Sequence, residues 1–149
     1  MGEAGEAGRL VSSSGASFGL VPVPGVVRAS GRLLVDVELV DDGTLVCYLG
    51  RRVRPAALAT LADAYRRAAT DAHPERTVEP VDLPGAGARV AFVASDTLTV
   101  TVRCSVARNL DDADPELDVR TLRIVRTVLA TAARELAWLV GPTPDTTAS

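Results

Sequence analysis

The 149-residue sequence contains no lysine, a single histidine and very few aromatic residues. All 16 basic residues are arginines, which, together with the many alanines and valines, is typical of proteins encoded by GC-rich bacterial genomes. The net charge of −3 argues against a general nucleic-acid-binding function, because such proteins need a basic surface. Aromatic residues make up only 3% of the chain, so the core must be built from aliphatic side chains.

The sequence also has only two cysteines and no long apolar run. Two cysteines in a chain of this length do not form a disulfide framework, and Cys47 and Cys104 both fall on strand faces that we expect to be buried. We therefore predict two free, buried thiols. No run approaches the about 20 apolar residues that span a bilayer. The N-terminus carries Glu3 and Glu6 where a secretory signal would be cationic, so we expect a cytoplasmic protein with no membrane partner.

The length of the chain is sufficient for one domain, since folding at this size buries about 70% of the surface of the unfolded chain. Residues 1–17 are small and polar, which predicts a disordered N-terminal tail. Residues 18–141 are expected to form a single α+β domain, and residues 142–149 a disordered C-terminal tail. The start of the domain is apolar but contains Pro22 and Pro24, so it is at best an edge strand or an extended arm.

Alternating apolar residues predict a β-hairpin over residues 32–52. A two-residue loop in this hairpin would pair Val37 with Tyr48, whereas a three-residue loop pairs Val37 with Cys47. Only the three-residue loop places two apolar rows on one face of the hairpin. We therefore predict a type I turn with Gly43 as the left-handed bulge residue.

A helix and a second hairpin follow. Pro55 suits a first helical turn, and apolar residues at helical spacing predict a helix over residues 55–72. The second hairpin turns at Ser95-Asp96, and the threonines of its second strand fit a solvated face. The residues predicted to face the core from this hairpin are Val90, Phe92, Ala94, Leu98, Val100, Val102 and Cys104.

The strongest pattern predicts a long helix from Asp114 to Val140. Asp114 and Pro115 suit its start, and Gly141-Pro142 suits its end. The apolar residues that share one stripe of this helix are Leu122, Val125, Leu129, Ala132, Leu136 and Leu139. The element order is then (β)ββαββα. It predicts an α+β fold in which a four- or five-stranded antiparallel sheet, made of two hairpins, carries two helices on one face.

The order of strands and helices between Gly31 and Val140 resembles the YbjN-type, type III secretion chaperone-like family. The resemblance includes a final helix that follows an aspartate-rich turn at Leu110-Asp111 and ends in an aromatic residue, in Ala137-Trp138-Leu139. It implies a small dimeric chaperone or regulatory partner and no enzymatic activity. The family offers no catalytic residues to assign.

Candidate catalytic and metal-binding residues have simpler explanations. His73 is the sole histidine, so no site that needs two histidines can be built, and it suits the end of a helix. An acidic run lacks the glycine and the distal glutamate of a calcium loop, and helix capping explains several of its members. That run consists of Asp111, Asp112, Asp114, Glu116 and Asp118. A group of three arginines precedes the first helix without a glycine-rich phosphate cradle, and comprises Arg51, Arg52 and Arg54. We predict no catalytic residue, metal or cofactor.

The outward side of the predicted C-terminal helix is the candidate partner-binding surface. On a helical wheel the sole tryptophan, Trp138, falls opposite the core stripe, where a merely solvated face should be polar. Arg134 lies four residues earlier and can stack on the indole, and both residue types are enriched at binding hot spots. The predicted partner-binding residues are Ile124, Thr127, Thr131, Arg134 and Trp138. The alternative is that the apolar arm at residues 18–23 covers Trp138.

Three functions remain open at this point. The first is a non-enzymatic interaction protein, a chaperone-like or regulatory adaptor that acts as a homodimer or on a protein partner. The second is a domain that binds an apolar small molecule between sheet and helices, and the third, favoured least, is an enzyme. Ligand binding predicts an internal pocket with convergent polar groups. An adaptor predicts a filled core and an exposed apolar patch.

Overall fold

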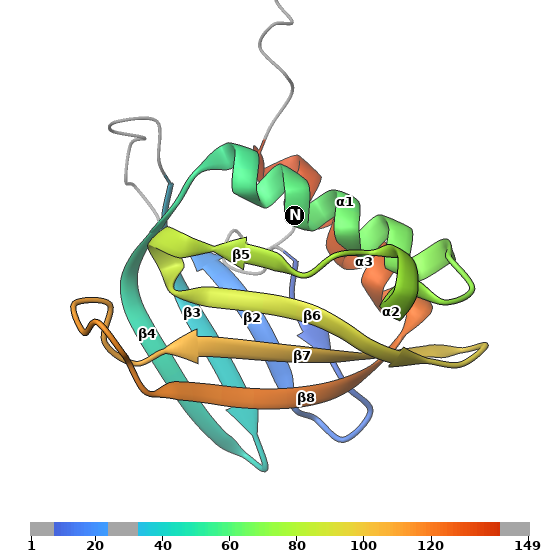
Figure 1. Ribbon diagram of the computed structural model, residues 1–149, viewed down its shortest axis with the longest axis horizontal. Helices are drawn as coiled ribbons and strands as arrows, with labels where there is room; N and C mark the ends of the chain where they lie inside the picture. The colour runs from blue at the N-terminus through green and yellow to red at the C-terminus, as the bar shows by residue number, and fades with distance from the viewer. Residues whose placement is uncertain (1–7, 24–32, 141–149) are drawn as a thin grey trace, which may run out of the picture.

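The computed structural model describes residues 8–23 and 33–140, which form two consecutive units, each with four strands and a long helix at its end (Figure 1). The first unit comprises β1 (Leu10–Val11), β2 (Ser17–Pro22), β3 (Leu33–Asp41), β4 (Thr44–Val53) and helix α1 (Pro55–Thr70). The second unit comprises α2 (Pro74–Thr77), β5 (Val81–Leu83), the 3-10 helix η1 (Pro84–Ala86), β6 (Ala88–Ser95), β7 (Thr99–Ala107), β8 (Leu117–Val125) and helix α3 (Arg126–Val140). All strand pairs are antiparallel.

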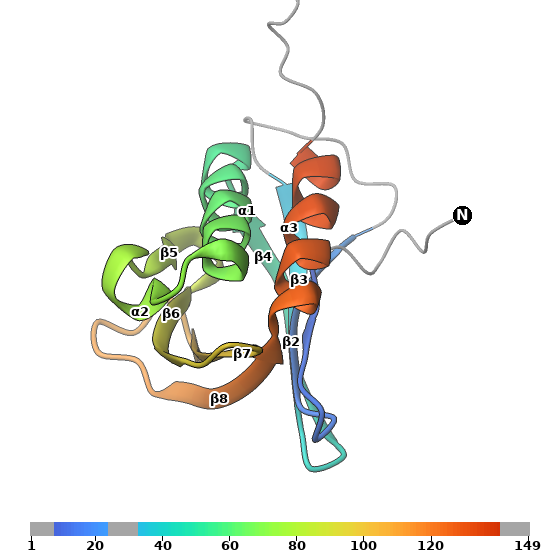
Figure 2. The same cartoon turned by 90° about the vertical axis from the view of Figure 1, so that its right-hand side faces the viewer.

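The strands form two four-stranded sheets, ordered β1-β2-β3-β4 and β5-β6-β7-β8. In Figure 1 the second sheet lies in front of the first, and α1 and α3 lie side by side above both sheets. Figure 2 shows the two sheets set at an angle, with both helices on the open side of that angle. The core is one hydrophobic cluster with members from both sheets and both helices, and its largest fully buried side chains include Phe18, Leu39, Leu58, Leu122 and Leu136.

The α+β class predicted from the sequence is confirmed, but the protein has two sheets where one was expected. The N-terminal part of the chain accounts for much of the difference. β1 lies within the predicted disordered tail, and β2 pairs with strands on both sides instead of lying at an edge. Pro22 is accommodated because it is the last residue of β2. The remainder of the two predicted tails, residues 1–7 and 142–149, lies outside the described residues.

The predicted helix from Asp114 to Val140 is wrong in its first part, because Leu117–Val125 is strand β8 and α3 begins at Arg126. β8 pairs with β7 along its whole length, from Thr99 opposite Val125 to Ala107 opposite Leu117. The segment alternates buried and exposed residues towards its end, and it is rich in β-branched residues, which favours a strand. Long-range pairing with β7 therefore decides the structure where the local sequence suits either element.

The loop of the first hairpin is also shorter than predicted. Asp41 pairs with Thr44, so Asp42 and Gly43 form a two-residue loop, and both have positive φ angles, 52° and 80°, as a type I′ turn requires. The register then pairs Val37 with Tyr48, the alternative that the apolar pattern disfavoured. The apolar pattern predicts the wrong register because both faces of β4 carry apolar residues.

This register also corrects the prediction for one of the two cysteines. Cys47 faces outward from β4 and is exposed, whereas Cys104 on β7 is buried as predicted. The second hairpin otherwise follows its predicted face. Five of its seven predicted core residues are buried, namely Val90, Phe92, Val100, Val102 and Cys104. Leu98 precedes the strand β7 and is 71% exposed.

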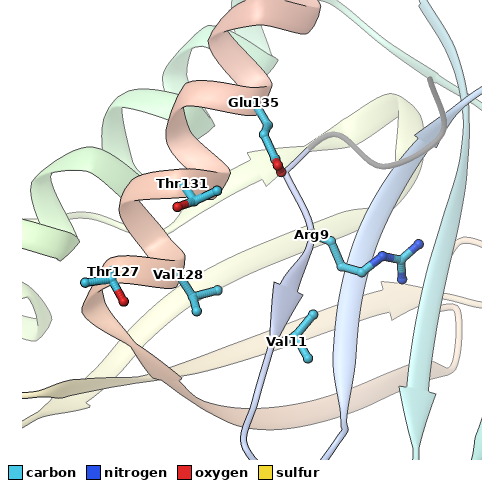
Figure 3. A pocket seen from close by; sticks show the side chains of 6 residues that line it. All are labelled: Arg9, Val11, Thr127, Val128, Thr131 and Glu135. Carbon is cyan, nitrogen blue, oxygen red and sulfur yellow. The ribbon is translucent and has the colours of Figure 1, made fainter. Parts of the chain in front are cut away.

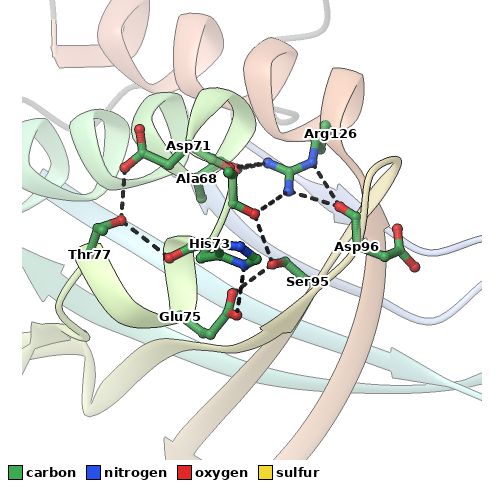
Figure 4. Close-up of polar contacts among 9 residues, drawn as sticks. Ala68, Asp71, His73, Glu75, Thr77, Ser95, Asp96 and Arg126 are labelled. Atoms are coloured by element: carbon green, nitrogen blue, oxygen red, sulfur yellow. Dashed lines mark hydrogen bonds and ion pairs between the residues drawn. The ribbon is translucent and has the colours of Figure 1, made fainter.

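Arg126 fixes the point at which β8 becomes α3 (Figure 4). Its guanidinium donates hydrogen bonds to the carbonyl oxygens of Ala68, Asp71 and Ala72 at the end of α1, and to that of Asp96 in the β6–β7 turn. The last carbonyls of a helix have no partner within the helix, and a cation there also interacts favourably with the helix dipole. One side chain therefore joins the end of α1, the β6–β7 turn and the start of α3.

Tyr65 is the largest side chain buried in the core, and its ring packs edge-on against Phe92 with centroids 6.5 Å apart. Its hydroxyl is buried and has no hydrogen-bond partner among the described residues. Burial raises the pKa of this hydroxyl well above its usual value, so it stays protonated. An unpaired buried hydroxyl costs about 1–3 kcal/mol, so the tyrosine is less favourable here than a phenylalanine of the same shape.

The Tyr65→Phe variant is therefore expected to be at least as stable as the wild type, with a gain of up to about 1 kcal/mol in the free energy of unfolding in urea. Tyr48→Phe is the matched control, because Tyr48 is also buried but its hydroxyl donates to Asp118. The control should lose about 1 kcal/mol. A clear loss of stability in Tyr65→Phe would show that its hydroxyl has a partner in solution.

Candidate functional site

The exposed side of α3 contains four of the five predicted partner-binding residues. Thr127, Thr131, Arg134 and Trp138 are all exposed and lie within one narrow stripe of the helix. Trp138 is 85% exposed, so residues 18–23 do not cover it, and Phe18 and Leu20 are instead buried in the core. The opposite side of α3 packs on the core through Leu129, Ala132, Ala133 and Leu136.

The fifth residue, Ile124, was placed incorrectly. It lies on β8 and is fully buried, because alternate residues of that strand point inward towards the core. The error follows from extending the helix through the strand. The candidate surface, termed the α3 ridge, therefore consists of Thr127, Thr131, Arg134 and Trp138.

A cleft of about 310 Å³ runs along one side of the α3 ridge, between α3 and β1 (Figure 3). Its lining residues are Arg9, Val11, Thr127, Val128, Thr131 and Glu135. Glu135 Oε1 accepts a hydrogen bond of 3.0 Å from the backbone N–H of Gly8. Arg9 points away from α3 and forms a 2.7 Å ion pair with Glu38. Both charged residues are therefore engaged in holding β1 in place, and they do not converge on a ligand.

A larger groove of about 550 Å³ runs along the other side of the ridge, between α1 and α3. Most of its lining is alanine: Ala59, Ala62, Ala69, Ala130, Ala133 and Ala137, with Val140 at the end of α3. Asp63 and Arg66 on the α1 side form an ion pair with each other. The groove therefore has an apolar floor, and Arg134 stands on its α3 rim.

Arg134 does not stack on Trp138 as predicted. Its guanidinium donates a 3.3 Å hydrogen bond to Thr131 Oγ1, and no carboxylate of the described residues pairs with it. The guanidinium that lies over a ring in the described chain is that of Arg51, 5.2 Å from the centroid of Tyr48. Within the part of the chain that the structure describes, the charge of the exposed Arg134 is thus not neutralised.

A polar cluster around His73 is the arrangement closest to a catalytic site (Figure 4). Ser95 Oγ donates to Glu75 Oε1 at 2.6 Å, and Glu75 Oε2 lies 3.6 Å from His73 Nδ1. In a serine nucleophile site the imidazole lies between the serine and the carboxylate, but here the carboxylate is central. The hydrogen bond from Ser95 also lowers the pKa of Glu75, which makes it a poor base. This cluster therefore serves to join α2 to β6.

One arginine engages two of the five members of the acidic run after β7. Arg108 forms ion pairs with Glu116 at 2.9 Å and with Asp118 at 2.8 Å. Hydrogen bonds from Arg108 and Tyr48 lower the pKa of Asp118, which keeps its carboxylate charged. Within residues 8–23 and 33–140, no three histidine, cysteine or acidic side chains come together as a metal site.

The three arginines before α1 separate into two environments. Arg51 is buried and donates to the carbonyl oxygens of Ala86 and Arg108, so it joins β4 to the second unit. Arg52 and Arg54 line an open cleft of about 320 Å³ near the start of α1. Pro55 removes one of the backbone donors that an anion would use there.

Comparison with known proteins does not assign the chain to a family. No family model matches it, and no curated protein or solved structure matches it significantly. The resemblance to the YbjN-type, type III secretion chaperone-like family therefore stays a prediction. No helix of the described residues is long and apolar enough to cross a membrane.

Proposed function

We propose that this chain is a non-enzymatic interaction domain, an adaptor or chaperone-like protein that binds a helix of a partner protein on the outer side of α3. The observation that carries the proposal is the 85% exposure of Trp138. Burying a large apolar side chain contributes about 1.5–3 kcal/mol of favourable free energy. Burial of the exposed indole in an interface would therefore stabilise a complex substantially. Tryptophan is also the residue type most typical of binding hot spots.

The groove beside the α3 ridge favours a helix as the partner element. A helix that binds in a groove inserts apolar residues at intervals of three and four into an apolar floor. The alanine floor between α1 and α3 has this character, because its short side chains leave room for larger ones from a partner. Arg134 lines this groove, and Trp138 lies four residues further along the α3 ridge. The partner helix would therefore be amphipathic.

The charge on the rim favours acidic residues on that helix. Arg134 is exposed and has no carboxylate partner among the described residues. An acidic residue beside the apolar face of the partner helix would pair with it. An ion pair at the rim of an interface mainly affects the association rate and the salt dependence of binding. Binding is thus expected to weaken moderately as the salt concentration rises.

The other functions considered from the sequence have less support. A small apolar ligand was expected between sheet and helices, whereas the alanine-lined groove opens on the outer surface of the two helices. For an enzyme, the polar cluster of His73, Glu75 and Ser95 has its groups in the wrong order for nucleophilic catalysis. The interaction function is therefore the one that accounts for the exposed residues.

Affinity capture from an extract of the native host tests the proposal with a matched pair of variants. Wild type, Trp138→Ala and Leu98→Ala are used as baits, because Trp138 and Leu98 are both exposed apolar residues, at 85% and 71%. A partner should bind to the wild type and to Leu98→Ala. Trp138→Ala should bind it roughly 30-fold or more weakly, as expected for a hot spot worth about 2 kcal/mol.

Both variants should melt at the wild-type temperature, since neither side chain is packed in the core. Arg134→Glu should also weaken binding of the same partner, and this loss should depend on salt. Identical sets of bound proteins for the three baits would contradict the proposal. Unfolding of Trp138→Ala would mean that the indole has a structural role instead.

A further inference from the structure

Strand β4 ends the first sheet, and the residues that the structure describes leave half of its free edge uncovered. β4 pairs with β3 on one side, and no other strand of the described residues pairs with it. In its first half the outward side chains are apolar and exposed: Leu45 is 56% exposed, Leu49 is 73% exposed, and the Cys47 thiol lies between them. An apolar edge strand with unpaired backbone groups is a template for another strand.

The pairing of β4 with β3 determines which backbone groups are free. Asp41 and Thr44 close a two-residue loop, so they exchange both of their hydrogen bonds. Hydrogen-bonded and non-hydrogen-bonded pairs then alternate along an antiparallel ladder, which makes Val40–Leu45 and Glu38–Cys47 non-hydrogen-bonded pairs. The N–H and C=O groups of Leu45 and Cys47 therefore point away from β3, towards the free edge.

The second half of the same edge is covered. A Cβ atom added to Gly85 of η1 would lie 2.1 Å from the carbonyl oxygen of Arg52, so η1 packs directly against the β4 backbone. Arg51 also donates to the carbonyl oxygens of Ala86 and Arg108. Gly50, with φ of +67°, lies where the pairing of β4 with β3 shifts its register, between the uncovered and the covered half of the edge. The free edge therefore runs from residue 44 to residue 49.

We propose that two copies of the chain pair edge to edge through this half of β4, antiparallel, about a twofold axis at Cys47. In this register Cys47 lies opposite Cys47 of the second copy, and Leu45 lies opposite Leu49. The free backbone groups of Leu45 and Cys47 all point across the axis, and the apolar residues form one continuous row. A twofold interface requires such self-complementarity, and the alternation of this strand supplies it.

The charges at the ends of the pairing are complementary in the same register. Asp42 lies in the turn before the free edge and Arg52 lies beyond Gly50, so antiparallel pairing brings the end of one copy that carries Asp42 towards the end of the second copy that carries Arg52. Both are exposed, and neither forms an ion pair with the described residues. Glu38, which lies beside Cys47 on the outer face, is already neutralised by Arg9 at 2.7 Å. Like charges therefore do not oppose the contact.

The interface is short, so the dimer should be weak and should depend on concentration. About six residues of edge strand contribute less than the roughly 800 Å² per partner of a standard stable interface. The α3 ridge takes no part in it. The dimer and the partner-binding function can therefore fail independently, and Trp138→Ala should leave the dimer intact.

Sedimentation equilibrium with one matched pair of variants tests the surface. Leu49→Lys places a charge in the apolar row, whereas Leu98→Lys places the same charge at an equally exposed leucine in the β6–β7 turn (73% and 71%). The wild type and Leu98→Lys should show the same monomer–dimer equilibrium, and Leu49→Lys should raise the dimer dissociation constant at least tenfold. A monomer at all concentrations, or equal dimerisation of all three proteins, would overturn the proposal.

Disulfide trapping tests the register. Diamide accepts the two electrons and two protons that a pair of thiols loses on forming a disulfide. Residues of a hydrogen-bonded antiparallel pair have Cα atoms about 5.5 Å apart, which a disulfide can span. Wild type should therefore form a disulfide-linked dimer through Cys47, while the buried Cys104 should not react.

In a Cys47→Ser background, Leu45→Cys and Leu49→Cys provide the control for random collision. Each introduced thiol lies opposite the other position, so a mixture of the two variants should cross-link. Neither variant alone should cross-link, because identical residues would be four positions apart, about 13 Å along the strand. Equal cross-linking of each variant alone and of the mixture would contradict the register.

Discussion

Arg126→Ala is expected to lower the free energy of unfolding by about 3 kcal/mol, measured by denaturation in urea. The guanidinium donates to four carbonyl oxygens, three of them at the end of α1. A hydrogen bond to a charged group contributes about 1.5–3 kcal/mol when buried, and partial exposure of Arg126 reduces this value. Alanine would leave these carbonyls without their donor and would remove the connection between α1 and α3.

Two controls separate the geometry of the side chain from its charge. Arg126→Lys keeps the positive charge near the end of α1 but cannot reach several carbonyls at once, so it should lose about half as much stability. Arg123→Ala removes a neighbouring arginine whose ion pair with Asp96 is exposed, and it should cost less than 1 kcal/mol. Equal effects of Arg126→Ala and Arg123→Ala would show that the contacts of Arg126 contribute little.

Gly85→Ala is expected to destabilise the protein by about 3 kcal/mol, at the upper end of the range for overpacking. The added Cβ would lie 2.1 Å from the carbonyl oxygen of Arg52. A rotamer change cannot relieve a contact with backbone, so η1 and β4 would have to move apart. That movement would also strain the hydrogen bond of 2.8 Å between Arg51 and the carbonyl oxygen of Ala86.

Gly43→Ala is the matched control for Gly85→Ala. Gly43 has a φ of +80°, but a Cβ added there would have no neighbour within 4 Å. The substitution should therefore lower the free energy of unfolding by only about 1 kcal/mol, because alanine is less favourable than glycine at a positive φ. If the two alanine variants have the same stability, the close approach of η1 to β4 does not hold in solution.

Local pattern was sufficient where one element buries one face. Four of the five residues of the predicted α1 face and five of the seven predicted inward residues of the second hairpin are buried, including Leu58, Tyr65, Phe92 and Val102. The predicted stripe of the C-terminal helix is also buried from Leu129 to Leu136. In these segments the period of the apolar residues matches the secondary structure. The apolar pattern alone is therefore sufficient to predict which face is buried.

The errors lie where long-range pairing decides between two local possibilities. The apolar residues of β8 continue the helical spacing of α3, so the pattern places Leu122 and Val125 on the helix. Only the pairing with β7 distinguishes the two structures. The face of β4 that is buried depends on its register with β3, and the three-residue loop predicted for this hairpin assigns Cys47 to the wrong face.

Only part of the candidate surface could be predicted from the sequence. The helical wheel predicts that Trp138 and its neighbours on the α3 ridge are exposed. This prediction holds because these residues lie on a helix in both the predicted and the observed structure. The alanine-lined groove could not be predicted, because it requires α1 and α3 to lie side by side. Nor could the free edge of β4, since it depends on the order of strands in the first sheet.

The most direct test of partner binding at Trp138 uses the fact that the chain has a single tryptophan. A chain labelled with 5-fluorotryptophan should give one ¹⁹F resonance, and its chemical shift should respond to replacing H₂O by D₂O because the indole is solvent-exposed. Addition of the captured partner should shift the resonance and remove this solvent effect. A resonance insensitive to solvent in the dilute chain, or unchanged by a partner that binds, would contradict the α3 ridge as the binding surface.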